Sequence, residues 1–364
     1  MSIPACKRGL ITTINEAFMK KMGLAAFVLS WIASVGAASY LDQYENKAES
    51  WYSGPEAKEV ADTFLTWQSP AGSWPKNVDT TRKAYTGDPN DLKGTFDNGA
   101  TVGEMRFLAR IYKATGNERY KQAFLKGFAH ILEAQYPSGG WPQYYPLSKQ
   151  YHRHITFNDD TMVHLMVLMR DAASQPLYDF LDAQHRKAAQ QAFERGIDCI
   201  LKCQIRVHGK LTVWCAQHDA VDLSPRPGRS YELVSLSGSE SASILRLLMS
   251  LDNPGPEVID AVMAGAQWYE ASGIHGIRIA KVDGNRVAVE DPQAEPLWAR
   301  FYEIETNRPF FADRDGVKYY QFNELGTDRR NGYSWYGSWG QGVANDYKKW
   351  QKKWADRIAA HHRQ

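Results

Sequence analysis

The stretch QSPAGSWPK at residues 68–76 returns as QYPSGGWPQ at residues 135–143, 67 residues further along the chain. A looser version occupies residues 204–214, where Gln204, Gly209 and Trp214 keep the order of the same three residue types. A period of this length is typical of stacked or toroidal folds, in which one unit cannot bury its apolar face alone. This repeat therefore decides the fold class.

Each repeat places its Gly-Trp loop between two helix-like runs. The runs before the loops cover residues 61–67, 123–134 and 192–203, and those after them cover residues 104–114, 162–173 and 244–251. A polar cluster precedes each second run, namely FDNGAT at 96–101, FNDDT at 157–161 and LSGSES at 236–241. Asp, Asn and Ser at such positions are N-cap signals. The unit is predicted to be helix, loop, polar cap, helix, with the caps on one rim of an (α/α) toroid.

The composition changes near residue 253. Residues 257–271 still indicate a helix, and Asp283-Gly284 between two β-like stretches predicts a hairpin. Residues 296–339 are aromatic and irregular, and residues 344–360 should form a closing helix. We therefore predict a mainly α protein. Toroid-like helical repeats span about 45–252, and an irregular, partly β region, about 253–364, forms one side of a cleft.

The N-terminal region has the layout of a secretory signal. Lys20 and Lys21 precede an apolar run at 23–35, and small residues follow at 36–39. The run is too short to span a bilayer comfortably. We expect residues 1–38 to be a signal peptide, with Met19 or Met22 as alternative starts, and residues 39–364 to be a secreted catalytic module, extracellular or periplasmic.

Charge and cysteine content exclude several classes. The first 38 residues carry four basic side chains and one acidic, so the remaining chain has a net charge of about −1. No basic excess remains to bind nucleic acid. Cys199, Cys203 and Cys215 lack the partners of a zinc site and are predicted to be structural, either as free thiols or with one disulfide. A monomer is expected.

Carboxylates gather at the predicted caps. Asp97 and Asn98 in the first repeat correspond to the Asn158-Asp159-Asp160 cluster in the second. If the repeats face each other these oxygens converge, which suits a hard cation such as Ca²⁺. Two alternatives stay open on the residues alone. The side chains could serve only as N-caps, or an acid/base pair of aspartates could hydrolyse a glycoside.

Arginines in constrained loops point to an anionic ligand. Arg229 lies in the stretch PRPGRSYEL at 225–233, where proline and glycine restrict the backbone. Arg300 and Arg314 lie in the aromatic C-terminal region, and Lys76 directly follows the first Trp-Pro. Arginine binds planar carboxylates through two parallel hydrogen bonds. A surface salt bridge between Arg229 and Glu232 is the structural alternative.

These motifs together resemble the polysaccharide lyase family 10 pectate lyases over roughly residues 45–345. The resemblance is carried by stretches around residues 74–77, 95–101, 134–143, 154–160, 214–219, 229–233 and 313–316, in the same order. It implies an (α/α) toroid-like catalytic module and Ca²⁺-dependent β-elimination of polygalacturonate (pectate), an anionic polysaccharide.

The resemblance also implies roles for individual residues. Arg229 matches the proposed Brønsted base, with Arg226 the other candidate arginine of that loop. Asp97 and either Asp159 or Asp160 match the Ca²⁺ site. Substrate-binding residues are expected to be Arg300, Arg314, Lys76, Asn98 and Tyr231. An inverting toroid hydrolase and a non-catalytic pectin-binding module remain as alternatives.

Overall fold

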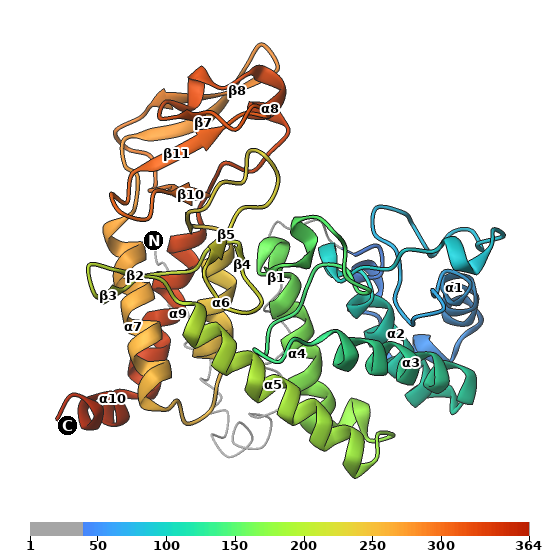
Figure 1. Cartoon of the computed structure of the whole chain (residues 1–364). Coiled ribbons are helices and arrows are strands. Elements are labelled where there is room, and N and C mark those ends of the chain that lie inside the picture. The colour runs from blue at the N-terminus through green and yellow to red at the C-terminus, as the bar shows by residue number, and fades with distance from the viewer. Residues whose placement is uncertain (1–38, 364) are drawn as a thin grey trace, which may run out of the picture. The chain divides into compact units, whose positions relative to one another are not determined.

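The computed structural model describes residues 39–363, and the predicted signal peptide lies outside them. The described chain is mainly helical (Figure 1). Its helices are α1 Pro55–Leu65, α2 Val102–Thr115, α3 Glu118–Ala134, α4 Thr161–Ser174, α5 Ala183–Cys203, α6 Glu240–Met249, α7 Pro256–Ala271, α8 Thr327–Asn331, α9 Trp339–Lys353 and α10 Ala355–His361. None of these described helices is both long and apolar enough to cross a membrane.

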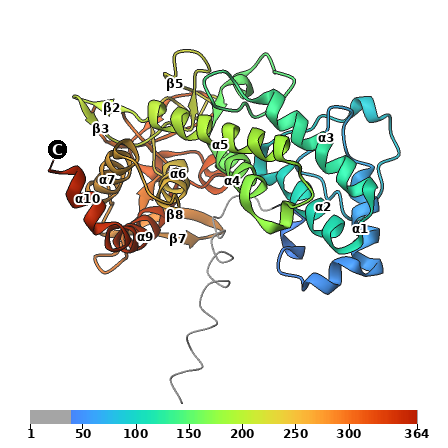
Figure 2. The same ribbon diagram turned by 90° about the horizontal axis from the view of Figure 1, so that it is seen from below.

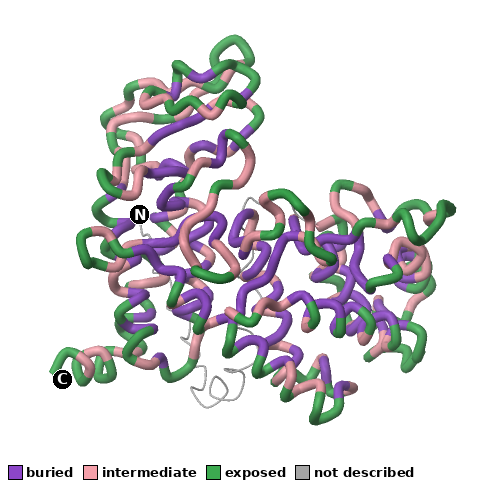
Figure 3. Tube along the Cα trace, in the orientation of Figure 1, coloured by how far each residue is buried: buried purple, intermediate pink, exposed green. Residues whose placement is uncertain are grey.

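The larger helices form a two-layer array, which Figure 2 shows from below. Helices α2, α4 and α6 contact one another in sequence, and α3, α5 and α7 do the same in the second layer. Each of α2, α4 and α6 also packs against its partner in the second layer, and α9 covers α6 and α7. The buried segments in Figure 3 follow the helix faces between the layers. This arrangement confirms the predicted mainly α, toroid-like fold.

The repeated glutamine joins each unit to the next. The Nε2 atom of Gln68 donates to the carbonyl of Gly72, at 3.0 Å, and to that of Ala123 on α3, at 2.9 Å. Gln135 makes the same pair of bonds to Gly139 and to Ala192 on α5. Even the looser third copy does so, because Gln204 donates to Thr212 and to Ala261 on α7. One side chain thus satisfies backbone carbonyls of two successive repeats.

The repeated tryptophan and glycine also make the same contacts in successive repeats. Trp74, Trp141 and Trp214 are fully buried, and each indole N–H donates to a carbonyl of the helix before its loop, at 2.7–2.8 Å. Gly72 and Gly139 have φ of 109° and 93°, and a Cβ would lie 2.5 Å from the Lys126 carbonyl oxygen and 2.1 Å from that of Arg195. Only glycine fits where the loop lies so close to the next helix.

The predicted N-caps are wrong for α2 and α4, whereas the Ser237 hydroxyl accepts the N–H of Glu240, the first residue of α6, at 3.2 Å. Helices α2, α4 and α6 begin after Thr101, Asp160 and Ser239, and none of these three described side chains caps its helix. Asp97 and Asp159 lie in the preceding 3-10 turns, η5 (Asp97–Gly99) and η7 (Asn158–Asp160). Their carboxylates are therefore available for other interactions.

The strands of the protein are short, and they lie both in the loops of the repeats and in the irregular C-terminal region. They are β1 Ile155–Thr156, β2 Arg206–Val207, β3 Lys210–Leu211, β4 Gln217–His218, β5 Pro225–Arg226, β6 Leu236–Ser237, β7 Ile277–Val282, β8 Asn285–Glu290, β9 Trp298–Ala299, β10 Phe301–Tyr302, β11 Pro309–Ala312, β12 Lys318–Tyr319 and β13 Tyr336–Gly337. The first six of these, β1 to β6, lie in the repeats. The predicted hairpin is present as β7–β8, and the order β12-β11-β10-β6 joins the third repeat to the C-terminal region. The predicted closing helix is interrupted at Trp354, between α9 and α10.

Candidate active site

Backbone hydrogen bonds bring the loops of the repeats side by side. The Phe96 N–H donates to the Gln143 carbonyl, at 3.0 Å, and the Gln143 N–H donates to the His152 carbonyl, at 2.9 Å. Further along, β1 pairs with β4 and β4 pairs with β5, which leads directly into the loop of Arg229. The predicted site residues of all three repeats therefore lie along one rim of the array.

Turns η5 and η7 contact each other and share an unusual backbone. Asn98, Asp159 and Asp160 have φ of 54°, 50° and 60°. Non-glycine residues rarely adopt this left-handed region, and such strain collects at functional sites. The two turns occupy equivalent places in their repeats, so the strained backbone conformation is a feature of the repeat itself.

Asp97 is 2% exposed and forms an ion pair through its Oδ2 atom with Lys76. Its Oδ1 atom is buried and accepts no hydrogen bond from any described residue. A buried carboxylate oxygen without a partner is costly. This atom is the strongest indication on the rim of a place for a cation or a substrate hydroxyl.

Arg300 joins η7 to the third repeat. Its Nη2 atom donates to Asn158 Oδ1, at 3.2 Å, to Asp159 Oδ1, at 3.0 Å, and to Glu240. Arg300 and Glu240 are 5% and 1% exposed, so this is a buried ion pair. Burial raises the pKa of Glu240, and Arg300 opposes that effect. Asp160 accepts a hydrogen bond from Ser243 on α6.

Arg229 lies between aromatic rings and a buried carboxylate. Its guanidinium carbon is 5.0 Å from the ring centre of Tyr231 and 5.6 Å from that of Tyr333. Its Nη2 atom forms an ion pair with Glu232, whose side chain is 2% exposed. Burial alone would lower the pKa of Arg229, but Glu232 outweighs burial and holds that pKa above its ordinary value. The structure thus contains the Arg229–Glu232 pair that was the structural alternative, but its carboxylate is buried and not at the surface.

Tyr151 and His152, which the sequence analysis missed, lie between the two ends of the rim. Both interact electrostatically with Asp97 and Arg229. Burial raises the pKa of Tyr151 to about 12 although Arg229 opposes it, so the hydroxyl keeps its proton. Burial, and then the charge of Lys76, lower the pKa of His152. The only available signal was their position just before η7, which repeat one does not reproduce.

Arg314 differs from the other predicted arginines because its side chain is exposed. It pairs with Asp328 at 3.0 Å, and the two side chains are 69% and 88% exposed. Its turn nevertheless adjoins the Arg229 loop, since a Cβ on Gly316 would lie 3.2 Å from the Ser230 carbonyl oxygen. Arg314 could reach a ligand bound near Arg229 only by leaving Asp328.

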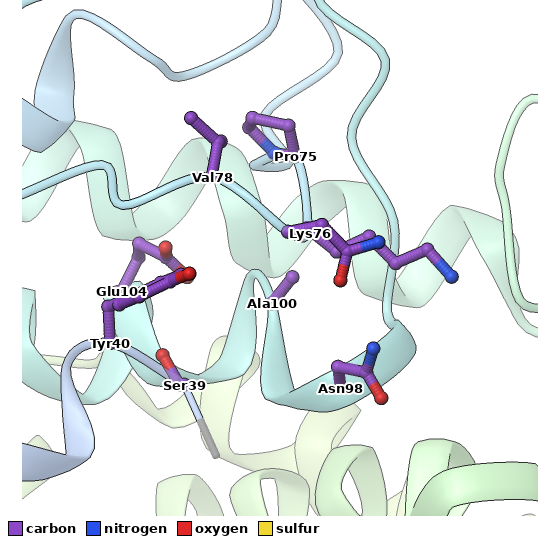
Figure 4. Close-up of a pocket in the computed structure, with 9 residues that line it drawn as sticks. Ser39, Tyr40, Pro75, Lys76, Val78, Asn98, Ala100 and Glu104 are labelled. Carbon is purple, nitrogen blue, oxygen red and sulfur yellow. The ribbon is translucent and has the colours of Figure 1, made fainter. Parts of the chain in front are cut away.

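A polar pocket of about 90 Å³ adjoins Lys76 and Asn98 (Figure 4). Glu104 on α2 lines it, with the Thr80 hydroxyl 3.3 Å from Oε1 and with no described partner for the buried Oε2 atom. Burial raises the pKa of Glu104 from 4.5 to about 7, against the hydrogen bonds it accepts. The carboxyl group therefore loses its proton near neutral pH.

This raised pKa predicts a pH-dependent stability. Folding favours protonated Glu104, so its stabilising contribution is complete below pH 4.5 and is lost as pH rises to about 7. Glu104→Gln should gain at most about 3 kcal/mol relative to the wild type between pH 5 and pH 8. Urea unfolding at both pH values measures this, with Glu118→Gln in the exposed first turn of α3 as control. An unchanged difference between wild type and Glu104→Gln would contradict it.

The free cysteines agree with a structural role. Cys199, Cys203 and Cys215 are free and buried. Burial raises the pKa of Cys215. Within residues 39–363, no cluster of three or more His, Cys, Asp or Glu side chains has the geometry to hold a metal ion. Protein charges instead occupy the rim, where Lys76 and Arg300 neutralise carboxylates of η5 and η7.

Comparison with known proteins identifies the relatives of this arrangement. A family model described as "Pectic acid lyase" matches residues 68–344. A solved family 10 polysaccharide lyase from Cellvibrio cellulosa is 37% identical, with a TM-score of 0.75 over 85% of this chain and 94% of that chain. An aspartate-to-alanine mutant of a family 10 polysaccharide lyase from the same organism, in complex with trigalacturonic acid, gives the same identity and TM-score and is 95% covered. No curated protein matches the chain.

Proposed function

Because the chain belongs to the pectic acid lyase family and is a pectate lyase, we propose that it cleaves 4-linked polygalacturonate by β-elimination with Arg229 as the Brønsted base. The observation that carries the proposal is the rim itself. Lys76 and Arg300 pair with carboxylates of the strained acidic turns. Tyr151 and His152 interact electrostatically with both Asp97 and Arg229, and a structural relative binds trigalacturonic acid. The hydrolase and binding-module alternatives have no comparable support.

The chemistry follows from the acidity of the substrate. The proton on C5 lies next to the uronate carboxylate, which accepts negative charge as that proton leaves. Neutral Arg229 takes the proton, and the C5–H electron pair forms a double bond between C4 and C5. The C4–O4 bond breaks, and O4 takes a proton from solvent. The products are a shortened chain and a 4,5-unsaturated oligogalacturonide.

Other residues of the rim would bind the anionic chain. Lys76 and Arg300 supply positive charge, and Asn98 and Tyr231 supply polar contacts and an aromatic ring. Arg300 is buried and already paired with Glu240, so it would act on the substrate mainly through the electrostatic potential of its positive charge and not through a direct contact. Arg314 would bind a carboxylate only after exchanging it for Asp328.

We propose that Asp97, together with Asp159 or Asp160, would hold a Ca²⁺ ion at η5 and η7. Oδ1 of Asp97, which is buried and unpartnered within residues 39–363, suits a hard cation. Asp159 and Asp160 already pair with Arg300 and Ser243, and would have to exchange these partners for the cation. A cation there would supply positive charge that binds the uronate carboxylate and favours loss of its neighbouring proton. Lys76 already pairs with Asp97, so the cation and the substrate together would displace it.

The raised pKa of Arg229 predicts alkaline activity. Only the neutral guanidine accepts a proton, and its fraction rises tenfold with each pH unit below the pKa. Since Glu232 raises that pKa, kcat should increase steadily from neutral pH to about pH 10. A pH–rate profile at saturating polygalacturonate tests this, and an acidic optimum would rule out Arg229 as the base.

Product masses test the reaction type. Each elimination makes one fragment, the unsaturated one, that is a water lighter than its hydrolysis counterpart, while the other fragment has the same mass in both reactions. Mass spectrometry of the released oligosaccharides therefore separates the two outcomes by the unsaturated products. Secretion as a monomeric module of residues 39–364 completes the proposal. Detecting Ser39 or Ala38 as the N-terminal residue of the exported protein would support it.

A further inference from the structure

Glu232 holds Arg229 at two separate points. Its Oε2 atom accepts the backbone N–H of Arg229 at 2.8 Å, and its Oε1 atom accepts Nη2 of the same residue. The backbone closes the same loop, because the Gly228 N–H donates to the Glu232 carbonyl and the Glu232 N–H donates to the Arg229 carbonyl. One buried carboxylate therefore fixes both the loop and the guanidinium.

The fit around this carboxylate leaves it little freedom. The Tyr333 hydroxyl donates to Oε1 at 2.7 Å, and a Cβ on Gly228 would lie 2.6 Å from Oε2. The Tyr333 ring also lies 4.8 Å from the guanidinium carbon of Arg300. Glu232 thus links the loop of Arg229 to the C-terminal aromatic cluster and, through Tyr333, to Arg300.

The pair with Glu232 leaves two guanidinium nitrogens without a hydrogen bond to any described residue, of which Nε is buried. Glu232 occupies Nη2, and Nε is buried without a partner. Nη1 forms no hydrogen bond with any residue in the described range 39–363. The Arg229 side chain is 40% exposed, and Nη1 is the nitrogen that is neither paired with Glu232 nor buried without a partner.

We propose that Glu232 is a positioning residue, which clamps Arg229 so that Nη1 is the nitrogen that takes the substrate proton. The inference rests on the proposed role of Arg229. The two bonds to Glu232 restrain a long side chain that would otherwise sample many rotamers. The guanidinium is therefore already positioned before the substrate binds.

Chemical rescue tests the clamp directly. In Arg229→Ala, free guanidine should restore part of the activity by binding between Glu232, Tyr231 and Tyr333. Adding Glu232→Gln should raise the guanidine concentration for half-maximal rescue about tenfold, because Gln lacks the charge and one acceptor. Equal rescue in the two backgrounds would overturn the proposal. Glu303→Gln is the matched control, since Glu303 also accepts from a cation and a tyrosine, Lys318 and Tyr320, but outside the rim.

Single variants decide the matter if guanidine rescues neither protein. Glu232→Gln should lower kcat about 100-fold with KM within about twofold. Tyr333→Phe, which removes only the hydroxyl donor, should lower kcat severalfold and serves if Glu232→Gln does not fold. An unchanged kcat per folded molecule would overturn the proposal. Full activity of Arg229→Ala would instead refute the role of Arg229 itself.

Discussion

Arg229→Lys is expected to lower kcat by about 10²–10⁴-fold, the contribution typical of a positioned general base, while KM changes little. Lysine has the lower reference pKa, so charge alone would favour it as a base. It lacks the planar fork that binds Glu232 and packs between Tyr231 and Tyr333. Steady-state kinetics on polygalacturonate measure the effect.

Arg226→Lys is the matched control for this variant. Arg226 lies in the same loop but pairs with Asp219, at 3.0 Å, and with Asp222, at 3.6 Å. Its replacement should leave kcat within about threefold, as expected for a partly exposed ion pair. If Arg226→Lys removed activity and Arg229→Lys did not, the base would have been assigned to the wrong arginine.

Arg300→Met should destabilise the fold by about 3–5 kcal/mol, because it leaves the buried Glu240 carboxylate without an opposite charge and with only the Ser237 hydroxyl as a donor. Glu240→Gln in the same molecule removes the stranded charge and should recover much of that loss. Urea unfolding of the wild type, the single variant and the double variant at one pH gives the three free energies of unfolding.

Arg314→Met provides the comparison, since its ion pair with Asp328 is exposed. Its effect on the free energy of unfolding should stay within about 0.5 kcal/mol. Equal losses of unfolding free energy in Arg300→Met and Arg314→Met would show that the buried Arg300–Glu240 pair stabilises the fold no more than the exposed pair does. That result would also remove Arg300 as a fixed charge beneath the substrate.

The repeat could be predicted because its residues make contacts within their own loop, or with a partner at a nearly fixed distance along the sequence. Gln68, Gln135 and Gln204 make the same two bonds, and even the looser third copy is confirmed. The glycine requirement at Gly72 and Gly139 likewise follows from one close contact repeated in each loop.

The pairing of charges could not be predicted in this way. Glu240 and Arg300 are separated by 60 residues, and Asp97 and Lys76 by 21, and no period relates them. The N-cap prediction failed at α2 and α4 for a related reason. A sequence shows an acidic residue before a helix, but not whether its side chain turns back to the helix or toward a neighbouring loop. Tyr151 and His152 were missed because their loop has no counterpart in the first repeat.

The most direct test of the account is the ultraviolet absorbance of polygalacturonate incubated at alkaline pH with residues 39–364. The assay is run with Ca²⁺ and repeated with excess EDTA. We expect absorbance from the conjugated double bond of an unsaturated uronide to grow with Ca²⁺ and to stop with EDTA. New reducing ends without that absorbance would mean hydrolysis, and would contradict β-elimination by Arg229.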